Sequence, residues 1–289
     1  MMQIRKAQRR NAKIKLGLQG PSGSGKTIGA LKVALGLAQS DWNKIVVIDT
    51  ESSSSELYAH LGEFSVLQLT PPFSPEAYIK AIELCESSGY DVIIIDSISH
   101  EWEGSGGILE IHSNMTGNSF TNWSKLTPRH NKFINKILGS SAHIIATVRA
   151  KQDYVLSDKN GKMVPEKVGL KGITREGMDY EFTLVFELDI KHNCNATKDR
   201  TQLFANRPEF RLNETVGNAI LNWCNEGVSL ESMKDKIEST DTIDELRTLY
   251  HNYPDFQKSL NNEFLSRRKL IESLENNTNG NHTSSTQSK

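Results

Sequence analysis

The chain of 289 residues is predicted to fold as an α/β protein with a mainly parallel central sheet flanked by helices, plus a small C-terminal helical module. Short apolar strands alternate with helical segments, which is typical of a parallel sheet with helices on both faces. Some strands, such as DVIIID at residues 91–96, are apolar throughout, as expected for parallel strands buried on both sides. Beyond residue 227 the alternation gives way to short amphipathic segments, which predict the helical module.

Hydrophobic period and turn residues place the individual elements. The expected strands are residues 14–19, 44–50, 66–69, 91–96, 143–148, 182–190 and 197–204, the last two as candidates for a hairpin. The expected helices are residues 27–39, 75–88, 127–139, 229–238, 242–253 and 255–274. Residues 151–177 are polar and rich in glycine and lysine, so they predict a loop, with a turn at residues 158–161.

The net charge of -1 conceals an uneven distribution along the chain. Residues 1–15 carry six basic side chains and no acidic one, whereas the remainder is acidic on balance. We therefore expect four parts: a basic arm at residues 1–12, an α/β core at 13–227, a helical module at 228–275 and a disordered polar tail at 276–289.

Composition excludes several classes of protein. No stretch of 18 apolar residues is present, so we expect no membrane span and no membrane partner. The basic N-terminus lacks the apolar region of a secretory signal. Cys85, Cys194 and Cys224 are too few and too scattered for a disulfide or metal framework, and the histidines show no ligand spacing. We expect a cytoplasmic protein.

The most specific signal is a phosphate-binding loop between the first strand and the first helix. Residues 20–27 fit the pattern G-x-x-x-x-G-K-[ST]; they are Gly20, Pro21, Ser22, Gly23, Ser24, Gly25, Lys26 and Thr27. Glycines let backbone N–H groups approach phosphate oxygens, and the helix N-terminus adds positive potential. Lys26 can reach the β- and γ-phosphates, and the Thr27 hydroxyl can bind Mg²⁺. ATP and Mg²⁺ are the expected ligands.

Acidic residues at strand ends supply the other expected groups. Asp96 ends an apolar strand, where a carboxylate can hold Mg²⁺ through water. No glutamate follows it directly, so the carboxylate that polarises the attacking water must lie elsewhere. Glu51, after the second strand, is our first candidate, and Glu101 is the alternative.

The phosphate loop, VVIDTE at residues 46–51, VIIIDS at 92–97 and HIIATVR at 143–149 together resemble the RecA-like ATPase core over residues 13–205. The resemblance implies a RecA-like P-loop NTPase in which Glu51 is catalytic and Asp96 is linked to the metal. The amino-acid sequence around these sites resembles even more closely that of phage-encoded RecA-like ATP-binding proteins of the single-strand annealing recombinase type. RecA-type enzymes sense the γ-phosphate with a glutamine after the fourth core strand. Here Gln152 comes later than expected, which leaves Thr147 and Arg149 as alternative sensors.

The same resemblance implies oligomers. Many RecA-like proteins present a pair of cations to the γ-phosphate of the neighbouring subunit, and Lys198 and Arg200 fit that pattern at the start of an expected strand. The assembly would be a ring or a filament. An ordinary turn with a surface ion pair is an equal alternative.

Two segments are candidates for contacts with single-stranded DNA, because RecA-like proteins bind DNA through loops after the third and fourth core strands. Residues 103–126 contain Phe120 and Trp123, which can stack on bases unless Trp123 belongs to the core. Residues 151–175 carry a net charge of +3, which suits a phosphate backbone. The basic N-terminal arm is a third candidate, for DNA or for docking between subunits.

The leading function is therefore an ATP-binding, ATP-hydrolysing RecA-like protein that acts on single-stranded DNA in phage recombination, replication or repair. A single-strand binding protein is an expected partner. One alternative is an ATP-independent protein that binds or anneals single-stranded DNA and uses the nucleotide site for regulation. A weaker alternative is a P-loop kinase.

Overall fold

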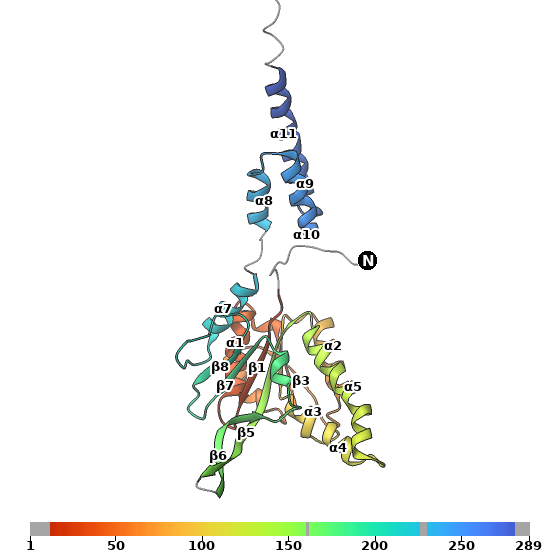
Figure 1. The fold of residues 1–289 in the computed structure, drawn as a ribbon, viewed down its shortest axis with the longest axis vertical. Helices are drawn as coiled ribbons and strands as arrows, with labels where there is room; N and C mark the ends of the chain where they lie inside the picture. Colours follow the sequence, from red (N-terminus) through yellow and green to blue (C-terminus); the bar gives the residue numbers. More distant parts are fainter. Residues whose placement is uncertain (1–11, 160–161, 226–229, 281–289) are drawn as a thin grey trace, which may run out of the picture. The chain divides into compact units, whose positions relative to one another are not determined.

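The strands assemble into one eight-stranded sheet in the computed structural model, which describes residues 12–159, 162–225 and 230–280 (Figure 1). The strand order is β3-β2-β4-β5-β1-β7-β8, and β6 pairs with β5 outside this path. The strands are β1 (Lys15–Gly20), β2 (Ile45–Asp49), β3 (Ser65–Gln68), β4 (Val92–Asp96), β5 (His143–Lys159), β6 (Lys162–Gly172), β7 (Leu184–Leu188) and β8 (Cys194–Asp199). The sheet is parallel from β3 to β7, which confirms the prediction of a mainly parallel sheet.

Helices cover both faces of this sheet. Those of the first 225 residues are α1 (Lys26–Leu37), α2 (Pro75–Ser87), α3 (Ser99–Glu103), α4 (Ile108–Ser113), α5 (Ser119–Leu138), α6 (Met178–Glu181) and α7 (Glu214–Asn225). Alternate strand residues, such as Ile93 and Ile95, join Phe133 of α5 and Ile82 of α2 in the main apolar cluster. The residues between them point to the opposite face, where α1 packs against β1, β4 and β5. All residues of β2 and β4 are therefore buried.

The helix that follows the phosphate loop is fixed by an unusually close contact with α7. A Cβ atom on Gly36 would lie 2.2 Å from the Glu214 carbonyl oxygen, and one on Gly217 would lie 2.1 Å from the Val33 carbonyl oxygen. Only glycine permits the two backbones to approach this closely. The contact fixes α1, the helix that begins at the phosphate loop, against α7.

The helix expected at residues 127–139 is longer than predicted. Helix α5 begins at Ser119, where the Asn118 side chain accepts a hydrogen bond of 2.8 Å from the Phe120 N–H. Its buried positions include Asn122, Leu126 and His130, at helical spacing. The predicted start was wrong because the buried face of α5 includes polar residues, so the helical spacing of apolar residues is not visible in this part of the sequence.

The loop predicted at residues 151–177 is also wrong in its first part. Strand β5 continues beyond the sheet core to Lys159, and β6 returns beside it in an antiparallel ribbon. The predicted turn at residues 158–161 spans the junction, and residues 160–161 lie outside the described residues. Backbone pairing that extends from a core strand overrides the polar composition.

The last two strands pair antiparallel, as a hairpin requires. Strand β8 covers Cys194–Asp199, so it begins three residues and ends five residues before the predicted range 197–204. The carboxylate of Asp199 explains the early end. It accepts backbone hydrogen bonds from Thr201, Gln202, Phe204 and Ala205, which turn the chain out of the sheet.

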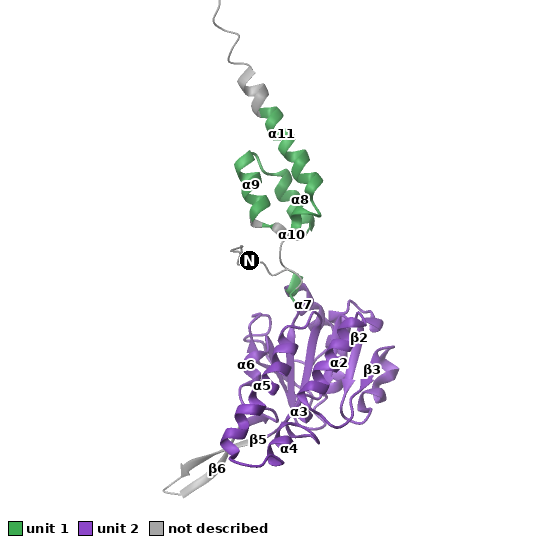
Figure 2. Cartoon of the chain, turned by 90° about the vertical axis from the view of Figure 1, so that its right-hand side faces the viewer, with its two compact units in different colours: residues 1–12, 224–289 green, residues 13–223 purple. Residues whose placement is uncertain are grey.

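The described residues form two compact units, one of Lys13–Trp223 and one that contains the C-terminal helices (Figure 2). These helices are α8 (Leu230–Glu238), α9 (Ile243–Asn252), α10 (Pro254–Gln257) and α11 (Asn261–Gly280). Their own apolar core consists of Met233, Ile237, Leu246, Phe256, Leu260, Phe264 and Ile271. The helix predicted at 255–274 is split in two. Helix α11 also extends into the predicted disordered tail, of which residues 281–289 lie outside the description, as do residues 1–11 of the basic arm.

All three cysteines are buried, and none of them forms a disulfide. Burial raises the pKa of the Cys85 thiol to about 11 and that of Cys194 to about 12. Within residues 12–159, 162–225 and 230–280, no helix has both the length and the apolar character needed to cross a bilayer.

Candidate functional site

The loop of residues 20–27 connects the carboxyl end of β1 to the start of α1, the position that the sequence motif requires. Gly23 and Gly25 adopt φ angles of 79° and 86°, a left-handed conformation that favours glycine. The Lys26 ammonium folds back across the loop and donates to the carbonyl oxygens of Gly20, at 2.9 Å, and Pro21, at 2.8 Å. The loop is therefore closed around the head group of its own lysine.

Lys26 lies in a mixed electrostatic environment. Burial lowers the pKa of its ammonium, while the nearby carboxylates of Asp96 and Glu51 oppose that effect. Next to it, the Ser24 hydroxyl is buried and has no hydrogen-bond partner among the described residues. Ser24 does not line the pocket that Lys26 lines, so of these two residues only Lys26 is placed to meet an anion there.

Asp96 joins the loop to the sheet. It ends β4 and is 3% exposed, and its carboxylate accepts hydrogen bonds from the hydroxyls of Thr27, at 2.6 Å, and Thr147, at 2.5 Å. Burial raises the pKa of Asp96, and the two hydroxyl donors oppose this rise. A loop residue, a β4 residue and a β5 residue therefore converge on one carboxylate.

Glu51 lies across the same site from Lys26. Arg149 donates to both of its carboxylate oxygens, from Nε to Oε1 at 2.8 Å and from a terminal nitrogen to Oε2, and the Ser97 hydroxyl donates to Oε1 at 3.2 Å. Burial alone would raise the pKa of Glu51, but the hydrogen bonds and charge of Arg149 outweigh it and hold the pKa below its ordinary value. Sequence reasoning missed this pair, because the two residues are 98 positions apart.

Asp49, the other acid at the end of β2, has a different place. It is fully buried and accepts hydrogen bonds from the Glu51 N–H at 2.7 Å and from the Ser55 N–H at 2.8 Å. Asp49 thus shapes the turn after β2 and sets the position of Glu51. The 3-10 helix that follows, Ser54–Leu61, brings Tyr58 to the site, which the sequence pattern did not indicate.

The alternative candidate for water activation, Glu101, does not reach this site. Its carboxylate is 1% exposed and contacts Nδ1 of His130 at 3.0 Å, between α3 and α5. Glu103, two residues further along α3, lines the site instead. Of the two candidates, Glu51 lines the pocket and Glu101 does not.

These groups surround a pocket of about 740 Å³ at the carboxyl ends of the strands, where open α/β sheets bind ligands. Its lining comprises Ser22, Gly23, Gly25, Lys26, Thr27, Ile28, Glu51, Ser54, Tyr58, Asp96, Glu103, Arg149, Ala150, Ile173 and His192. Hydroxyl and carboxylate oxygens are the donors that Mg²⁺ prefers, so Thr27 and Asp96 fit a magnesium site in their chemistry.

A protein-family model described as an AAA domain matches residues 12–211. The chain belongs to this AAA domain family. The match runs from just before β1 to beyond β8, so it covers the phosphate loop and every residue of the pocket. A search of curated proteins finds no match. An AAA domain with this α/β fold is a P-loop ATPase-like, nucleotide-binding protein.

The two cations proposed to act on a neighbouring subunit lie outside the AAA domain's own phosphate pocket. Lys198 lies one residue before the end of β8, not at the start of a strand as predicted. Arg200 is the first residue after that strand. The Lys198 ammonium donates to the carbonyl oxygens of Asp179, at 3.0 Å, and Tyr180, and Arg200 donates to the latter at 3.2 Å. Arg200 is exposed, whereas Lys198 is partly buried.

The three candidate sensors occupy different places. Thr147 holds Asp96, and Arg149 holds Glu51, so both contact groups of the pocket. Gln152 pairs through its backbone position with Leu170 in the β5–β6 ribbon, and its side chain lies outside the described part of the chain. The geometry therefore favours Arg149, whose guanidinium lines the pocket.

The first candidate DNA segment is helical and partly packed. Trp123 stacks against His112, with ring centroids 4.4 Å apart, and against Trp102, at 5.8 Å. Its ring therefore packs against α3 and α4, but the residue is only half-buried and does not belong to the main apolar cluster. Phe120, in contrast, is 85% exposed at the start of α5.

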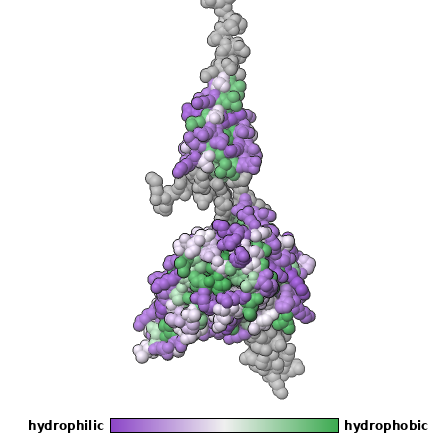
Figure 3. All heavy atoms as spheres, turned by 180° about the vertical axis from the view of Figure 1, so that it is seen from behind, coloured by the Kyte–Doolittle hydropathy of each residue, from purple (hydrophilic) through white to green (hydrophobic). Residues whose placement is uncertain are grey.

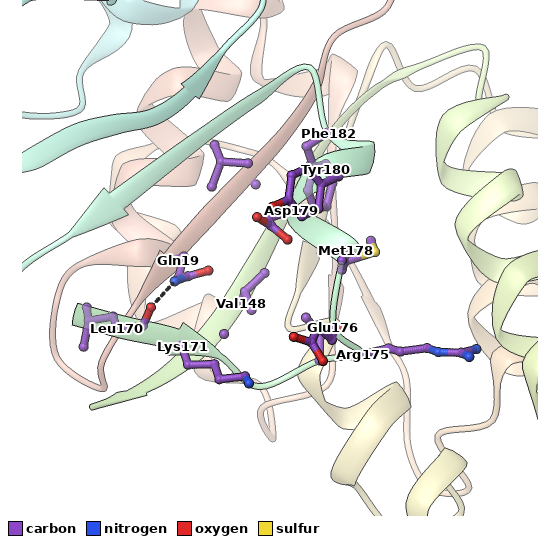
Figure 4. A pocket seen from close by; sticks show the side chains of 15 residues that line it. Gln19, Val148, Leu170, Lys171, Arg175, Glu176, Met178, Asp179, Tyr180 and Phe182 are labelled. Atoms are coloured by element: carbon purple, nitrogen blue, oxygen red, sulfur yellow. Dashed lines mark hydrogen bonds between the residues drawn. The ribbon is translucent and has the colours of Figure 1, made fainter. Parts of the chain in front are cut away.

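The second candidate segment borders a separate pocket of about 310 Å³ over β1 and β7 (Figure 4). Its lining mixes Lys171 and Arg175 with Glu176 and Asp179, and the Arg175 side chain points away from β1. Gln19 donates to the Leu170 carbonyl at 3.2 Å and fixes the base of the ribbon to the sheet. The side chains of Lys159, Lys162 and Lys167 lie outside the described residues.

We predict that Thr147→Val destabilises the α/β unit by about 2 kcal/mol, because a fully buried hydroxyl that donates to a charged group is removed without changing the side chain's shape. Thr147→Ser keeps the donor and should retain most of the stability. Urea unfolding of the two variants and the parent chain measures the difference. Equal losses in both variants would show that packing, and not the hydrogen bond, is what Thr147 provides.

Proposed function

We propose that the chain is a Mg²⁺-dependent ATPase that hydrolyses ATP to ADP and phosphate. The observation that carries this proposal is the convergence of Thr27 and Asp96, 2.6 Å apart, beside the Lys26 ammonium in a pocket that also contains Glu51. This set provides a cation that binds phosphate, oxygen atoms that can bind a metal ion, and a carboxylate that can accept a proton from a water molecule.

The roles of the residues follow from their positions. Lys26 exchanges the carbonyl oxygens of Gly20 and Pro21 for the β- and γ-phosphates, while the loop N–H groups hold the phosphate oxygens. Thr27 and, through water, Asp96 would hold Mg²⁺, which when bound neutralises charge on the phosphates. Glu51 accepts the proton of a water molecule that attacks the γ-phosphorus, and the bond from that phosphorus to the bridging oxygen breaks to release ADP.

Arg149 is the residue that we propose to sense the γ-phosphate. Its guanidinium neutralises Glu51 in this structure, so Glu51 is a weak base while the pair is intact. A γ-phosphate in the pocket offers the same guanidinium a more highly charged partner. Transfer of Arg149 to the phosphate would release Glu51 for the water molecule, which links base activation to the presence of ATP.

We predict that Lys26→Ala abolishes ATP binding, because this variant lacks the ammonium that binds the phosphates. Glu51→Gln retains that ammonium, so it should bind ATP but hydrolyse it about 100-fold more slowly. A fluorescent ATP analogue measures binding, and release of inorganic phosphate measures turnover. Lys32→Ala, on the same helix but outside the pocket, is the matched control for Lys26. Hydrolysis that is unchanged in Glu51→Gln would remove Glu51 from the mechanism.

We further propose that single-stranded DNA is the effector, in recombination, replication or repair of the type carried out by phage RecA-like annealing proteins in the host cytoplasm. Strand β5 supports this, because it leads from Arg149 in the pocket directly into the ribbon that carries Lys151 and, on β6, Lys171. The exposed Phe120 ring supplies a surface for base stacking. A single-strand binding protein is a fitting partner for such an activity.

We predict that single-stranded DNA stimulates ATP turnover and that the stimulation falls as the salt concentration rises, because release of counterions drives backbone contacts. An assay with and without a single-stranded oligonucleotide, at about 50 and about 200 mM NaCl, tests this. Phe120→Ala should weaken stimulation, and Leu84→Ala, an exposed apolar residue on α2 outside both candidate segments, is the control. An ATPase that neither binds DNA nor responds to it would refute the DNA half of the proposal alone.

One alternative deserves a direct comparison, an ATP-independent DNA-binding or annealing protein with a regulatory nucleotide site. The Lys26→Ala variant discriminates between the two: annealing that survives this change places ATP outside the core function. The weaker alternative, a P-loop kinase, requires a phosphorylated acceptor in place of free phosphate, which product analysis detects.

We propose finally that the ATPase works between subunits of a ring or filament. Lys198 and Arg200 support this, because they are a cationic pair that lies outside the chain's own phosphate pocket. In an oligomer they can stabilise the charge that develops on a neighbour's γ-phosphate.

We predict that Arg200→Ala lowers turnover about 100-fold, as loss of a donor to the transition state does. Mixing Arg200→Ala with Glu51→Gln subunits should then restore about a quarter of the parent activity, because a mixed interface combines an intact Glu51 with an intact Arg200. Turnover of the mixture is measured against each variant alone. Turnover per subunit that stays constant on dilution to monomers, or a mixture without recovery, would exclude action in trans.

A further inference from the structure

The C-terminal unit carries a groove of about 250 Å³ between α9 and α11, far in sequence from the nucleotide site. Leu246 and Phe264, both buried members of the unit's core, form its floor. Ile243, Tyr250 and Leu265 surround them, and 47% of Leu265 remains exposed. On the face drawn in Figure 3, these helices expose apolar side chains directly beside hydrophilic ones.

The rim of this groove is basic. Arg247 and His251 lie one helical turn apart on α9, and Arg268 lies on α11. Among the described residues that line the groove, none is acidic. An apolar floor with cations around it is complementary to a segment that combines apolar and acidic side chains.

Both guanidiniums can change partners at little cost. Arg247 contacts Asp244 at 3.5 Å, and that carboxylate is 94% exposed; Arg268 contacts Glu272 at 2.8 Å, with both side chains about half exposed. Exposed ion pairs of this kind contribute little to stability. A carboxylate brought to the groove by a partner would therefore replace them without leaving a buried charge unpaired.

The groove suits a peptide better than a nucleic acid. The Tyr250 ring meets Phe264 edge to face at 5.1 Å and His251 at 5.9 Å, so its surroundings are already occupied by aromatic partners and it offers little surface for base stacking. A phosphate backbone would satisfy the arginines but leave the apolar floor in contact with water. An apolar side chain that enters the groove covers the floor and places neighbouring carboxylates at the rim.

We infer that this groove, the α9–α11 groove, binds an acidic peptide segment of a partner protein by inserting an apolar side chain between the two helices. Such a surface would recruit a partner through the C-terminal unit while the AAA domain handles nucleotide. The inference stands on the groove's own residues and does not depend on ATP hydrolysis.

The test uses the full chain and a fluorescein-labelled peptide in which a Phe-Leu pair is flanked on both sides by aspartates. We expect saturable binding by fluorescence anisotropy that weakens when the salt concentration rises. Replacing the aspartates by lysines, or the Phe-Leu pair by alanines, should abolish it. No binding of the acidic apolar peptide would overturn the inference.

Variants assign the binding to the groove. Arg247→Glu combined with Arg268→Glu should raise the peptide Kd about tenfold or more. Lys258→Glu combined with Lys269→Glu makes the same change in net charge on exposed residues that do not line the groove, and it should leave Kd within about twofold. Equal losses in the two pairs would overturn the inference, because they would show a general effect of net charge.

Two further results would also overturn it. A labelled single-stranded oligonucleotide whose binding depends on Arg247 and Arg268, in the absence of peptide binding, would make the groove a nucleic-acid surface. Concentration-dependent self-association that Leu265→Ser removes would make it an interface between copies of this chain. Circular dichroism, which measures the helical content of the whole chain including α8–α11, reports whether each variant is folded.

Discussion

The nucleotide pocket depends on one buried carboxylate. Asp96 has almost no contact with solvent, and a buried charge is costly unless hydrogen bonds satisfy it. Its two donors come from different elements, Thr27 from α1 and Thr147 from β5. The same interaction that stabilises the charge therefore connects the phosphate loop to the centre of the sheet.

A second buried carboxylate, that of Asp49, organises the turn after the neighbouring strand β2. Asp49 is buried beside Asp96 in the sheet register, but its carboxylate is used up by backbone N–H groups of the following turn. That arrangement directs Glu51 toward Lys26 and Arg149 instead of into the sheet. Asp49 and Asp96 thus have separate roles at neighbouring strand ends, because different groups donate hydrogen bonds to them. Asp49 organises the backbone of the turn, and Asp96 belongs to the pocket.

Local sequence patterns were sufficient to place the phosphate loop and to predict a mainly parallel sheet, because glycine positions and apolar runs are short-range signals. They were insufficient where distant residues decide the outcome. The pairing of Glu51 with Arg149, the burial of Glu101 against His130 and the stacking of Trp123 each need partners brought together by the fold. The predictions for helix α5 and for the β5–β6 ribbon were wrong for the same reason. Packing in the helix and strand pairing in the ribbon outweighed the polar composition of these segments.

The burial of all three cysteines has a practical consequence for the study of motion in this molecule. A thiol reacts as the thiolate, and the raised pKa values of Cys85 and Cys194 leave almost none of that form near neutral pH. Their side chains, like that of Cys224, are also shielded from reagents. A single cysteine introduced on the surface of the ribbon or of the C-terminal helices would thus be the preferred attachment point for a fluorophore or spin label, with the native thiols left in place.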